Sequence, residues 1–322
     1  MDNLTHSLVG WALAETGLKR LTRKGTAACI LAANMPDIDV LFGGAPWPPL
    51  AMHRGFTHGL VGGVLLMPPV LAGLLWLLDR WQQWRVGSSL PHWPMRFGWL
   101  IALCYLGALT HSLLDLQNVY AVELFSPLSD RWFHTDGLFI ISPWLLVICG
   151  LGVAIARRRW NTGAHCAGRP ALAAIAATIV FVLINIGISR QAYAAVEADA
   201  PYARPDRIFA SPEPIAFWRR DIVWRQQGAI THGRYDPLRH PTGLVEFSAA
   251  QPDYMNDPRV RRAAQSLDRR LQSFLAWSQM PMAQVVQNGG VVKVTFRDAR
   301  FDAPSLRDRF TVSVSYPVKI RQ

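Results

Sequence analysis

Cysteine is scarce in this chain, and the cysteines that occur are far apart in the sequence. None forms a C-x-x-C pair, and three lie inside apolar segments; the four are Cys29, Cys104, Cys149 and Cys166. Isolated cysteines in apolar surroundings are typical of small buried hydrophobic side chains. The pattern therefore argues against a disulfide framework and against a thiolate metal site.

Charge is nearly absent from long stretches of a chain whose residues are 51% hydrophobic and whose mean hydropathy is positive. Four nearly uncharged windows approach the roughly 20 residues that cross the hydrocarbon core of a bilayer. They lie at about 58–78, 98–116, 138–156 and 171–189. This composition excludes an ordinary soluble domain and predicts a polytopic helical membrane protein.

The start of the chain lacks the basic segment and the small-residue cleavage pattern of a secretory signal peptide, so we expect the first segment to be retained. Residues 4–18 and 25–35 are apolar, but 15 and 11 residues are too few for a full crossing. These two segments predict partly inserted or re-entrant helices. The polar residues around Leu4 can cap the first of them.

The formal charge of +11 would suit a nucleic-acid-binding protein, but the basic residues are distributed as in a membrane protein. Only Arg54 and Arg131 stand in the short connections of one side. Eleven stand in the three short loops of the other side: Lys19, Arg20, Arg23, Lys24, Arg80, Arg85, Arg96, Arg157, Arg158, Arg159 and Arg169. Basic loops stay in the cytoplasm. We therefore expect membrane lipid, and no nucleic acid, as a partner.

The composition changes at about residue 191. The remaining chain has 19 basic and 13 acidic residues, no long apolar run and short alternating patches typical of strands. The patches are Phe217–Trp224, Val291–Phe296 and Phe310–Tyr316, and residues 257–277 predict one amphipathic helix. We predict a mainly α protein with a helical membrane domain at 1–190 and a small α+β domain outside the membrane at 195–322.

Seven histidine and aspartate residues flank apolar segments that carry almost no other ionisable groups. They are His6, Asp37, Asp39, His53, His58, His111 and Asp115. Imidazole nitrogens and carboxylate oxygens bind Zn²⁺, Mn²⁺ and Fe. His111 and Asp115 are four residues apart, so they share one face of a helix and can bind one ion together. The set predicts one or two divalent ions, zinc before manganese or iron.

Each of these residues also has a purely structural interpretation, because histidine caps helix carbonyls and aspartate caps helix amides. Thr57 is expected to cap the helix that carries His58. Arg54 lies between candidate ligands, where it can stabilise an anionic transition state or contact a lipid headgroup. His134 and Asp136 are an outer ligand pair, substrate contacts or part of a solvated loop.

Four motifs carry a family resemblance: Asn3-Leu4-Thr5-His6, Asn34-Met35-Pro36-Asp37-Ile38-Asp39, His53-Arg54-Gly55-Phe56-Thr57-His58 and His111-Ser112-Leu113-Leu114-Asp115. In this order they resemble the bacterial inner-membrane metal-dependent hydrolase family, whose best-known members are called LexA-regulated. The resemblance covers roughly residues 1–190. It implies a multi-pass protein of the bacterial inner membrane with a metal site, and less directly it implies a hydrolase.

The order of these residues is also distantly similar to that of the zinc phospholipase C and S1/P1 nuclease fold. That family uses three zinc ions and cleaves phosphoesters. This chain lacks the second His-x-x-x-Glu pair of that pattern, and His134 is the spare histidine nearby. The resemblance therefore does not extend to a third metal.

Two hypotheses about function follow. In the first, the chain is a membrane-embedded hydrolase in which a divalent ion lowers the pKa of bound water. Carboxylates then accept the proton and Arg54 stabilises the transition state, so Asp39 and Arg54 are the catalytic candidates. Because the site would lie at the outer membrane surface, with the second domain on the same periplasmic side, we expect a lipid or lipid-linked phosphoester as substrate.

In the second hypothesis, the chain is a metal transporter or a scaffold in which the His and Asp cluster is structural. Transporters place ionisable residues at the middle of their spans. Here His111 and Asp115 stand at the end of an apolar window, and the other candidates lie in turns. This placement favours the hydrolase.

Overall fold

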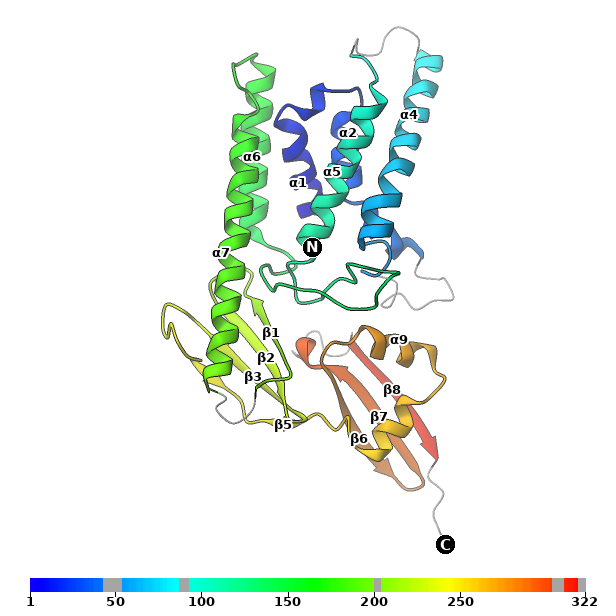
Figure 1. The fold of residues 1–322 in the computed structure, drawn as a ribbon, viewed down its shortest axis with the longest axis vertical. Helices are drawn as coiled ribbons and strands as arrows, with labels where there is room; N and C mark the ends of the chain where they lie inside the picture. Colours follow the sequence, from blue (N-terminus) through cyan, green and yellow to red (C-terminus); the bar gives the residue numbers. More distant parts are fainter. Residues whose placement is uncertain (43–53, 87–92, 200–203, 303–309, 318–322) are drawn as a thin grey trace. The chain divides into compact units, whose positions relative to one another are not determined.

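The computed structural model describes residues 1–42, 54–86, 93–199, 204–302 and 310–317, which form two compact units. The first unit contains Met1–Phe42, the described part of Met52–Gly187, and Pro214–Phe217. The second contains the described parts of Ile188–Glu213 and Trp218–Gln322. The first unit is helical and the second is rich in β-strands (Figure 1).

Helices of several kinds build the first unit. The α-helices are α1 (Asn3–Glu15), α2 (Gly25–Ala32), α4 (Met67–Val86), α5 (Phe97–Asp115), α6 (Pro143–Asn161) and α7 (Arg169–Asp199), of which α7 continues into the second unit. Two 3₁₀ helices, η1 (Leu18–Arg20) and η2 (Met35–Phe42), and the π-helical segment η3 (Leu60–Leu66) connect them. The carboxylate of Asp2 caps α1 by accepting the N–H of Thr5, as predicted.

Three described helical segments are long and apolar enough to cross a membrane: Leu60–Arg85, Phe97–Asp115 and Arg169–Ala198. They confirm three of the four predicted windows. The fourth window, 138–156, is not among these three segments; it is occupied by α6, which begins only at Pro143 because residues 138–142 are not helical. This helix also runs on through the three arginines at 157–159. The short helices α1 and α2 are present where the two short apolar segments predicted them.

Glycines bring α1 and α5 close to the same backbone carbonyl of α2. A Cβ atom at Gly10 would lie 2.6 Å from the carbonyl oxygen of Cys29, and one at Gly107 would lie 2.7 Å from the same oxygen. Small residues allow membrane helices to approach in this way. The tight contact matters for function because the carbonyl of Ala33, just after α2, faces His111 on α5.

The two ends of the helical unit differ in composition. The turn after α1, the end of α4 and the end of α6 lie at one end of the unit, whereas the chain start and the end of α5 lie at the other (Figure 1). Cations at the first end stack on tryptophans, as Arg20 does on Trp160 at 4.6 Å and Arg157 on Trp11 at 5.0 Å. The predicted cytoplasmic loops therefore share one end of the unit.

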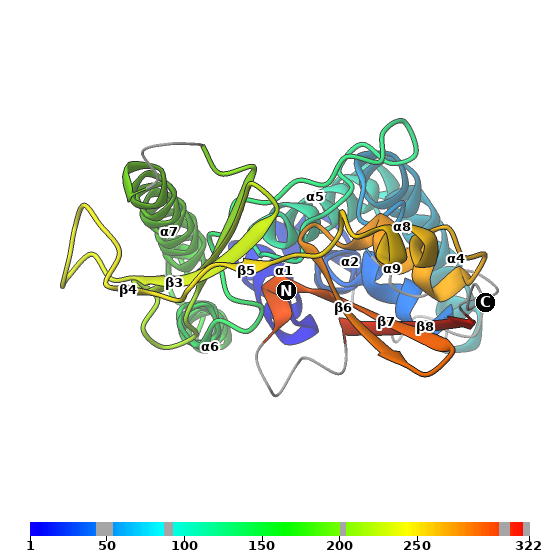
Figure 2. The ribbon, with the colours of Figure 1, turned by 90° about the horizontal axis from the view of Figure 1, so that it is seen from below.

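Two antiparallel sheets form the second unit. One contains β1 (Arg207–Pro212), β2 (Arg220–Gln226), β3 (Ala229–Tyr235), β4 (Glu246–Phe247) and β5 (Gln251–Pro252). The other has the order β6 (Pro281–Asn288), β7 (Val291–Asp298), β8 (Thr311–Pro317). In Figure 2, α8 (Pro258–Ala264) and α9 (Arg269–Trp277) lie together on one face of the second sheet.

The predicted single helix at 257–277 is wrong, because the chain breaks between α8 and α9. The carboxylate of Asp268 accepts the N–H groups of Arg270 and Leu271 and so starts a new helix. The break leaves Leu267, which lies between the two helices, 95% exposed. The three predicted strand patches correspond to β2, β7 and β8, with ends shifted by up to three residues.

Candidate metal centre

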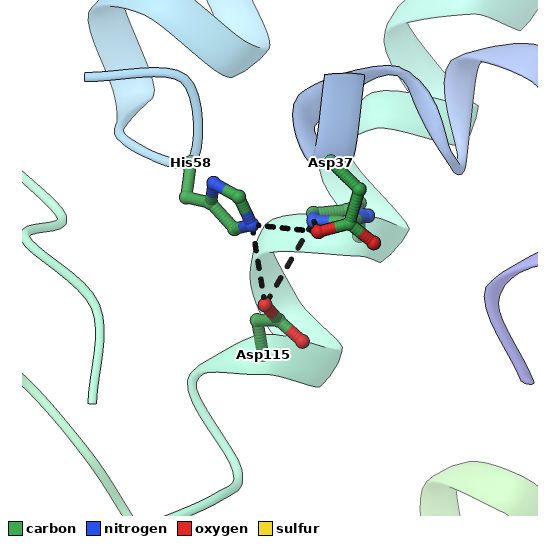
Figure 3. A group of neighbouring side chains, drawn as sticks. Asp37, His58 and Asp115 are labelled. Carbon is green, nitrogen blue, oxygen red and sulfur yellow. Dashed lines mark hydrogen bonds and ion pairs between the residues drawn. The ribbon is translucent and has the colours of Figure 1, made fainter. Parts of the chain in front are cut away.

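Four buried side chains from three separate segments converge at one end of α5. Asp37 comes from η2, His58 from the turn before η3, and His111 and Asp115 from α5. One ligand atom of each lies within 4.8 Å of those of all the others. Figure 3 shows the imidazole of His58 and the carboxylates of Asp37 and Asp115 pointing toward one another.

The separations between these atoms suit the coordination shell of a small divalent ion. Nε2 of His58 lies 3.1 Å from Oδ1 of Asp37 and 3.5 Å from Oδ2 of Asp115. Nε2 of His111 lies 3.8 Å from each of the same two oxygens. A tetrahedral zinc ion with bonds of about 2.0–2.2 Å separates its ligand atoms by roughly 3.3–3.6 Å. The four residues present therefore fit a divalent metal.

The hydrogen bond behind His111 shows why a cation fits between these atoms. Nδ1 of His111 lies 2.8 Å from the carbonyl oxygen of Ala33, and because a carbonyl can only accept, Nδ1 carries the proton. In the neutral ring Nε2 then has a lone pair, which faces carboxylate oxygens of Asp37 and Asp115. Buried acceptors that face one another are unfavourable unless a cation lies between them.

A hydroxyl group and a carboxylate lie behind His58. The hydroxyl of Thr57 donates to Oδ2 of Asp39 at 2.7 Å and lies 3.0 Å from Nδ1 of His58. The prediction that Thr57 caps the next helix is wrong. Gly59 precedes η3, with no side-chain cap, because the Thr57 side chain is engaged with Asp39 and His58.

His6 is next to the cluster and fully buried. Its ring stacks on that of His111 with centroids 4.0 Å apart, and its Nε2 lies 3.3 Å from Oδ1 of Asp115. Neither ring nitrogen of His6 has a hydrogen-bond partner among the described residues. The amino group of Met1 contacts the same Oδ1. Asp115 thus presents one oxygen to the four-residue cluster and the other to His6.

Arg54 is buried beside the cluster in the left-handed backbone region, with φ of 66°. Its guanidinium group donates to Oδ1 of Asn118 at 2.7 Å, stacks on the ring of Tyr120 at 5.0 Å and lies 3.5 Å from Oδ2 of Asp115. Such a conformation is costly for a residue other than glycine and is concentrated at functional sites. The arrangement aims one cation at the edge of the cluster.

The segment after α5 closes around Arg54 and the end of this helix. The N–H of Glu123 donates to the carbonyl of Arg54 at 3.0 Å. Burial raises the pKa of the Glu123 carboxyl, the nearby Asp130 adds to this, and a hydrogen bond from Ser126 opposes it. A few residues further along the chain, Nδ1 of His134 lies 2.8 Å from Oδ1 of the fully buried Asp136.

The predicted site residues therefore occupy different positions relative to the cluster. The structure brings together Asp37, His58, His111 and Asp115, with His6 alongside, and it places Asp39 behind His58 rather than among the four. His53 lies outside the described residues. Sequence reasoning missed the roles of Thr57, Asn118 and the carbonyl of Ala33. The pattern gave no signal for the carbonyl, and Asn118 was noticeable only as a polar residue after an apolar window.

Comparison with known proteins adds one finding. A family model described as YdjM inner membrane protein matches residues 1–193, which include every residue of the candidate metal centre. No curated protein and no solved structure matches the chain.

Proposed function

The chain belongs to the YdjM inner membrane protein family, and we propose that it is a membrane-embedded, metal-dependent hydrolase. The proposed substrate is a phosphoester, or a related bond, of a lipid or a lipid-linked molecule. One observation carries the proposal: two buried imidazoles and two buried carboxylates converge, with Nε2 of each histidine 3.1–3.8 Å from the same two carboxylate oxygens. The resemblance of the four sequence motifs to metal-dependent hydrolases supports the same reaction class.

In this proposal Asp37, His58, His111 and Asp115 hold a divalent ion, most simply zinc, because two imidazoles and two carboxylates form a common zinc donor set. When bound, such an ion would lower the pKa of water, so that hydroxide is available at neutral pH, and would polarise a phosphoryl oxygen. The two carboxylates offset its charge. Oδ2 of Asp37 is buried and has no hydrogen-bond partner among the described residues, so it is available to accept the proton of the attacking water.

Arg54 is the proposed electrostatic stabiliser. Asn118 and Tyr120 fix its guanidinium group beside Asp115, so the cation needs no rearrangement as negative charge develops on the phosphoryl oxygens. Preorganised donors of this kind account for a large part of many enzymatic rate enhancements. The planar fork of arginine also matches two phosphate oxygens at once.

His6 supports a second ion in the same site. Its buried Nε2 has no hydrogen-bond partner among the described residues and lies 3.3 Å from Oδ1 of Asp115, so these two groups would hold a second ion. Two ions clamp both the attacking and the leaving oxygen of a phosphoester displacement. The number of ions is therefore one or two.

The position of the cluster favours a hydrolase over a transporter. Asp115 is the last residue of α5, and Asp37 and His58 belong to short connections between helices. A transporter site is expected near the middle of its spans. A site at the end of a span is close to lipid headgroups, and in this proposal the positive-inside rule assigns this end to the periplasmic side.

The proposal is tested by assaying detergent-purified, zinc- or manganese-loaded protein on mixed micelles of phosphatidylglycerol and of a polyprenyl diphosphate. We expect release of a phosphorylated product, detected by mass spectrometry, which stops after chelation and returns when the metal is restored. Asp115→Asn is the matched inactive control. Metal-loaded protein that cleaves neither these lipids nor bis(p-nitrophenyl) phosphate would contradict the hydrolase.

A further inference from the structure

A hydroxyl group joins the second carboxylate of the Pro36–Asp39 turn to the cluster. Oγ1 of Thr57 lies 2.7 Å from Oδ2 of Asp39 and 3.0 Å from Nδ1 of His58, while Oδ2 lies 3.7 Å from that Nδ1. The side chain of Asp39 is 4% exposed and that of His58 is fully buried. The chain of three groups therefore has a buried imidazole at one end and a nearly buried carboxylate at the other, and the half-buried Thr57 joins them.

The number of available protons sets the direction of these hydrogen bonds. A hydroxyl has one proton, and an ionised carboxylate can only accept, so Thr57 donates to Asp39. The remaining lone pairs of the hydroxyl can then only accept, which requires Nδ1 of His58 to carry the ring proton. In the neutral ring Nε2 has no proton, and its lone pair faces Asp37 and Asp115.

We propose that Asp39 and Thr57 are positioning residues that hold His58 in its metal-binding tautomer, and that Asp39 is not itself a metal ligand. This inference rests on the proposed metal centre. Its basis is that Asp39 lies at Nδ1, whereas the ligand atoms lie at Nε2 on the other side of the ring. Partners that bind the second nitrogen of a ligating histidine fix its tautomer and raise its basicity.

The two histidines of the cluster are held by different kinds of partner. His111 donates to the backbone carbonyl of Ala33, a neutral group that no side-chain substitution removes. His58 donates to a hydroxyl polarised by a negative charge, and both of these groups belong to side chains. His58 is therefore the ligand whose donor strength the chain can adjust, and it is the one that mutation can test.

The test measures zinc affinity by competition with a chromogenic chelator in detergent. It compares the wild type with Thr57→Val, Asp39→Ala and the double variant, and Thr57→Ser is the matched control because serine keeps the hydroxyl. Each single loss should weaken zinc binding about 10–100-fold, the range typical of partners behind a metal ligand. The double variant should bind zinc as tightly as the more damaged of the two single variants, because both substitutions interrupt the same chain of hydrogen bonds. Thr57→Ser should bind zinc with wild-type affinity.

Other outcomes would overturn the inference. A ligand role for Asp39 would make Asp39→Ala far more damaging than Thr57→Val, with additive effects in the double variant. Wild-type affinity in both single variants would remove any role for the pair. If Asp39→Ala does not fold, as judged by its unfolding temperature without metal, then Thr57→Val against Thr57→Ser decides alone. If the wild type binds no zinc, manganese or iron, the metal centre itself fails, which is a different result.

Discussion

Arg54 combines features that rarely coincide in one residue: it is buried, charged and held at positive φ beside a cluster of carboxylates. Its contacts with Asn118 and Tyr120 explain how the side chain is fixed. The strained backbone is stable only because neighbouring groups support it. We interpret the fixed position of the guanidinium group as preorganisation for an anionic transition state. Substitution of Arg54 tests this interpretation.

Arg54→Gln should lower the turnover number on a phosphoester substrate by about 100-fold or more, the loss typical of one electrostatic stabiliser. Bound metal should stay near the wild-type amount, because Arg54 is not among the four ligands. Arg54→Lys keeps the charge without the planar fork, so it should recover part of the rate. Turnover and metal content are measured on one preparation. Wild-type turnover in Arg54→Gln would contradict the stabilising role of Arg54 in the transition state.

At this scale the sequence predicts the kinds of residue in the site better than their geometry. His111 and Asp115 could be paired because four residues make one helical turn. The division between Asp37, which faces the cluster, and Asp39, which lies behind His58, could not be predicted. These two residues are in a 3₁₀ turn, where a small change in backbone angles redirects a side chain. The role of Thr57 depends on the direction of the Asp39 side chain, to which its hydroxyl donates.

The contact between α2 and α5 links helix packing to the site. A Cβ atom on Gly107 would lie 2.7 Å from the carbonyl oxygen of Cys29, and His111 follows one turn later on the same helix. Backbone atoms cannot move aside as a flexible side chain can. An added methyl group must therefore push α5 away from α2 and lengthen the hydrogen bond from His111 to Ala33.

Gly107→Ala should destabilise the protein by about 1–3 kcal/mol through overpacking and should also weaken metal binding. Gly98→Ala on the same helix is the matched control, because a Cβ atom there meets nothing within 4 Å. The control should be neutral or slightly stabilising, since alanine favours helix more than glycine does. Unfolding temperature and zinc affinity are compared in detergent. Equal behaviour of the two variants would contradict the coupling between packing and site.

The second unit contains a buried ion pair where β7 ends. Asp298 accepts hydrogen bonds from Arg300 at 2.8 Å and 2.9 Å and from the hydroxyl of Ser278 at 2.6 Å. Burial raises the pKa of Asp298, but the charge of Arg300 and these hydrogen bonds outweigh it and hold the pKa below its ordinary value. Because the folded pKa is lowered, the stabilising effect is present at neutral pH and is lost as pH falls below the ordinary carboxyl value of about 3.9.

Asp298→Asn should therefore cost about 3–5 kcal/mol at pH 7, because it leaves a buried guanidinium without its counter-ion. The difference from the wild type should shrink as pH falls below about 4. Asp221→Asn is the control, since its carboxylate is 64% exposed and a surface ion pair contributes little. Unfolding is followed by circular dichroism of the purified protein across the pH range. A loss that does not change with pH would contradict the charge argument.

The length and periodicity of apolar runs predict whether a segment forms a helix or a strand. The residues at which these elements begin and end depend on contacts with distant parts of the chain. The long apolar windows around α4, α5 and α7 could be predicted because each exceeds what a soluble helix needs. The start of α6 was missed because the segment before Pro143 is as apolar as the helix itself. The break before α9 was missed because the apolar period continues through the Asp268 cap.

The whole molecule has a predicted orientation, with its basic helix ends in the cytoplasm and its metal centre and second unit on the periplasmic side. The native cysteines can test it, because Cys166 in the connection between α6 and α7 is exposed while Cys29, Cys104 and Cys149 are buried. Ser248 in the second unit is also exposed. The two positions should react from opposite sides of the membrane.

In spheroplasts, an impermeant maleimide should leave Cys166 unlabelled until the membrane is opened, whereas a Ser248→Cys variant should be labelled at once. Cys166→Ser is the control that assigns any signal after permeabilisation. Immediate labelling of Cys166 with protection of position 248 would mean that the orientation is inverted and that the metal centre faces the cytoplasm. The substrate would then have to be sought in the inner leaflet.

The most direct test of the account is the metal content of detergent-purified protein after loading with zinc, manganese or iron, measured by mass spectrometry of the elements. We predict about one to two divalent ions per chain. Asp115→Asn keeps the size of the side chain but removes a ligand charge, so bound metal should fall while the protein stays folded. A metal content near zero in folded wild-type protein, or an unchanged content in Asp115→Asn, would contradict the central claim that these buried histidines and aspartates form a metal centre.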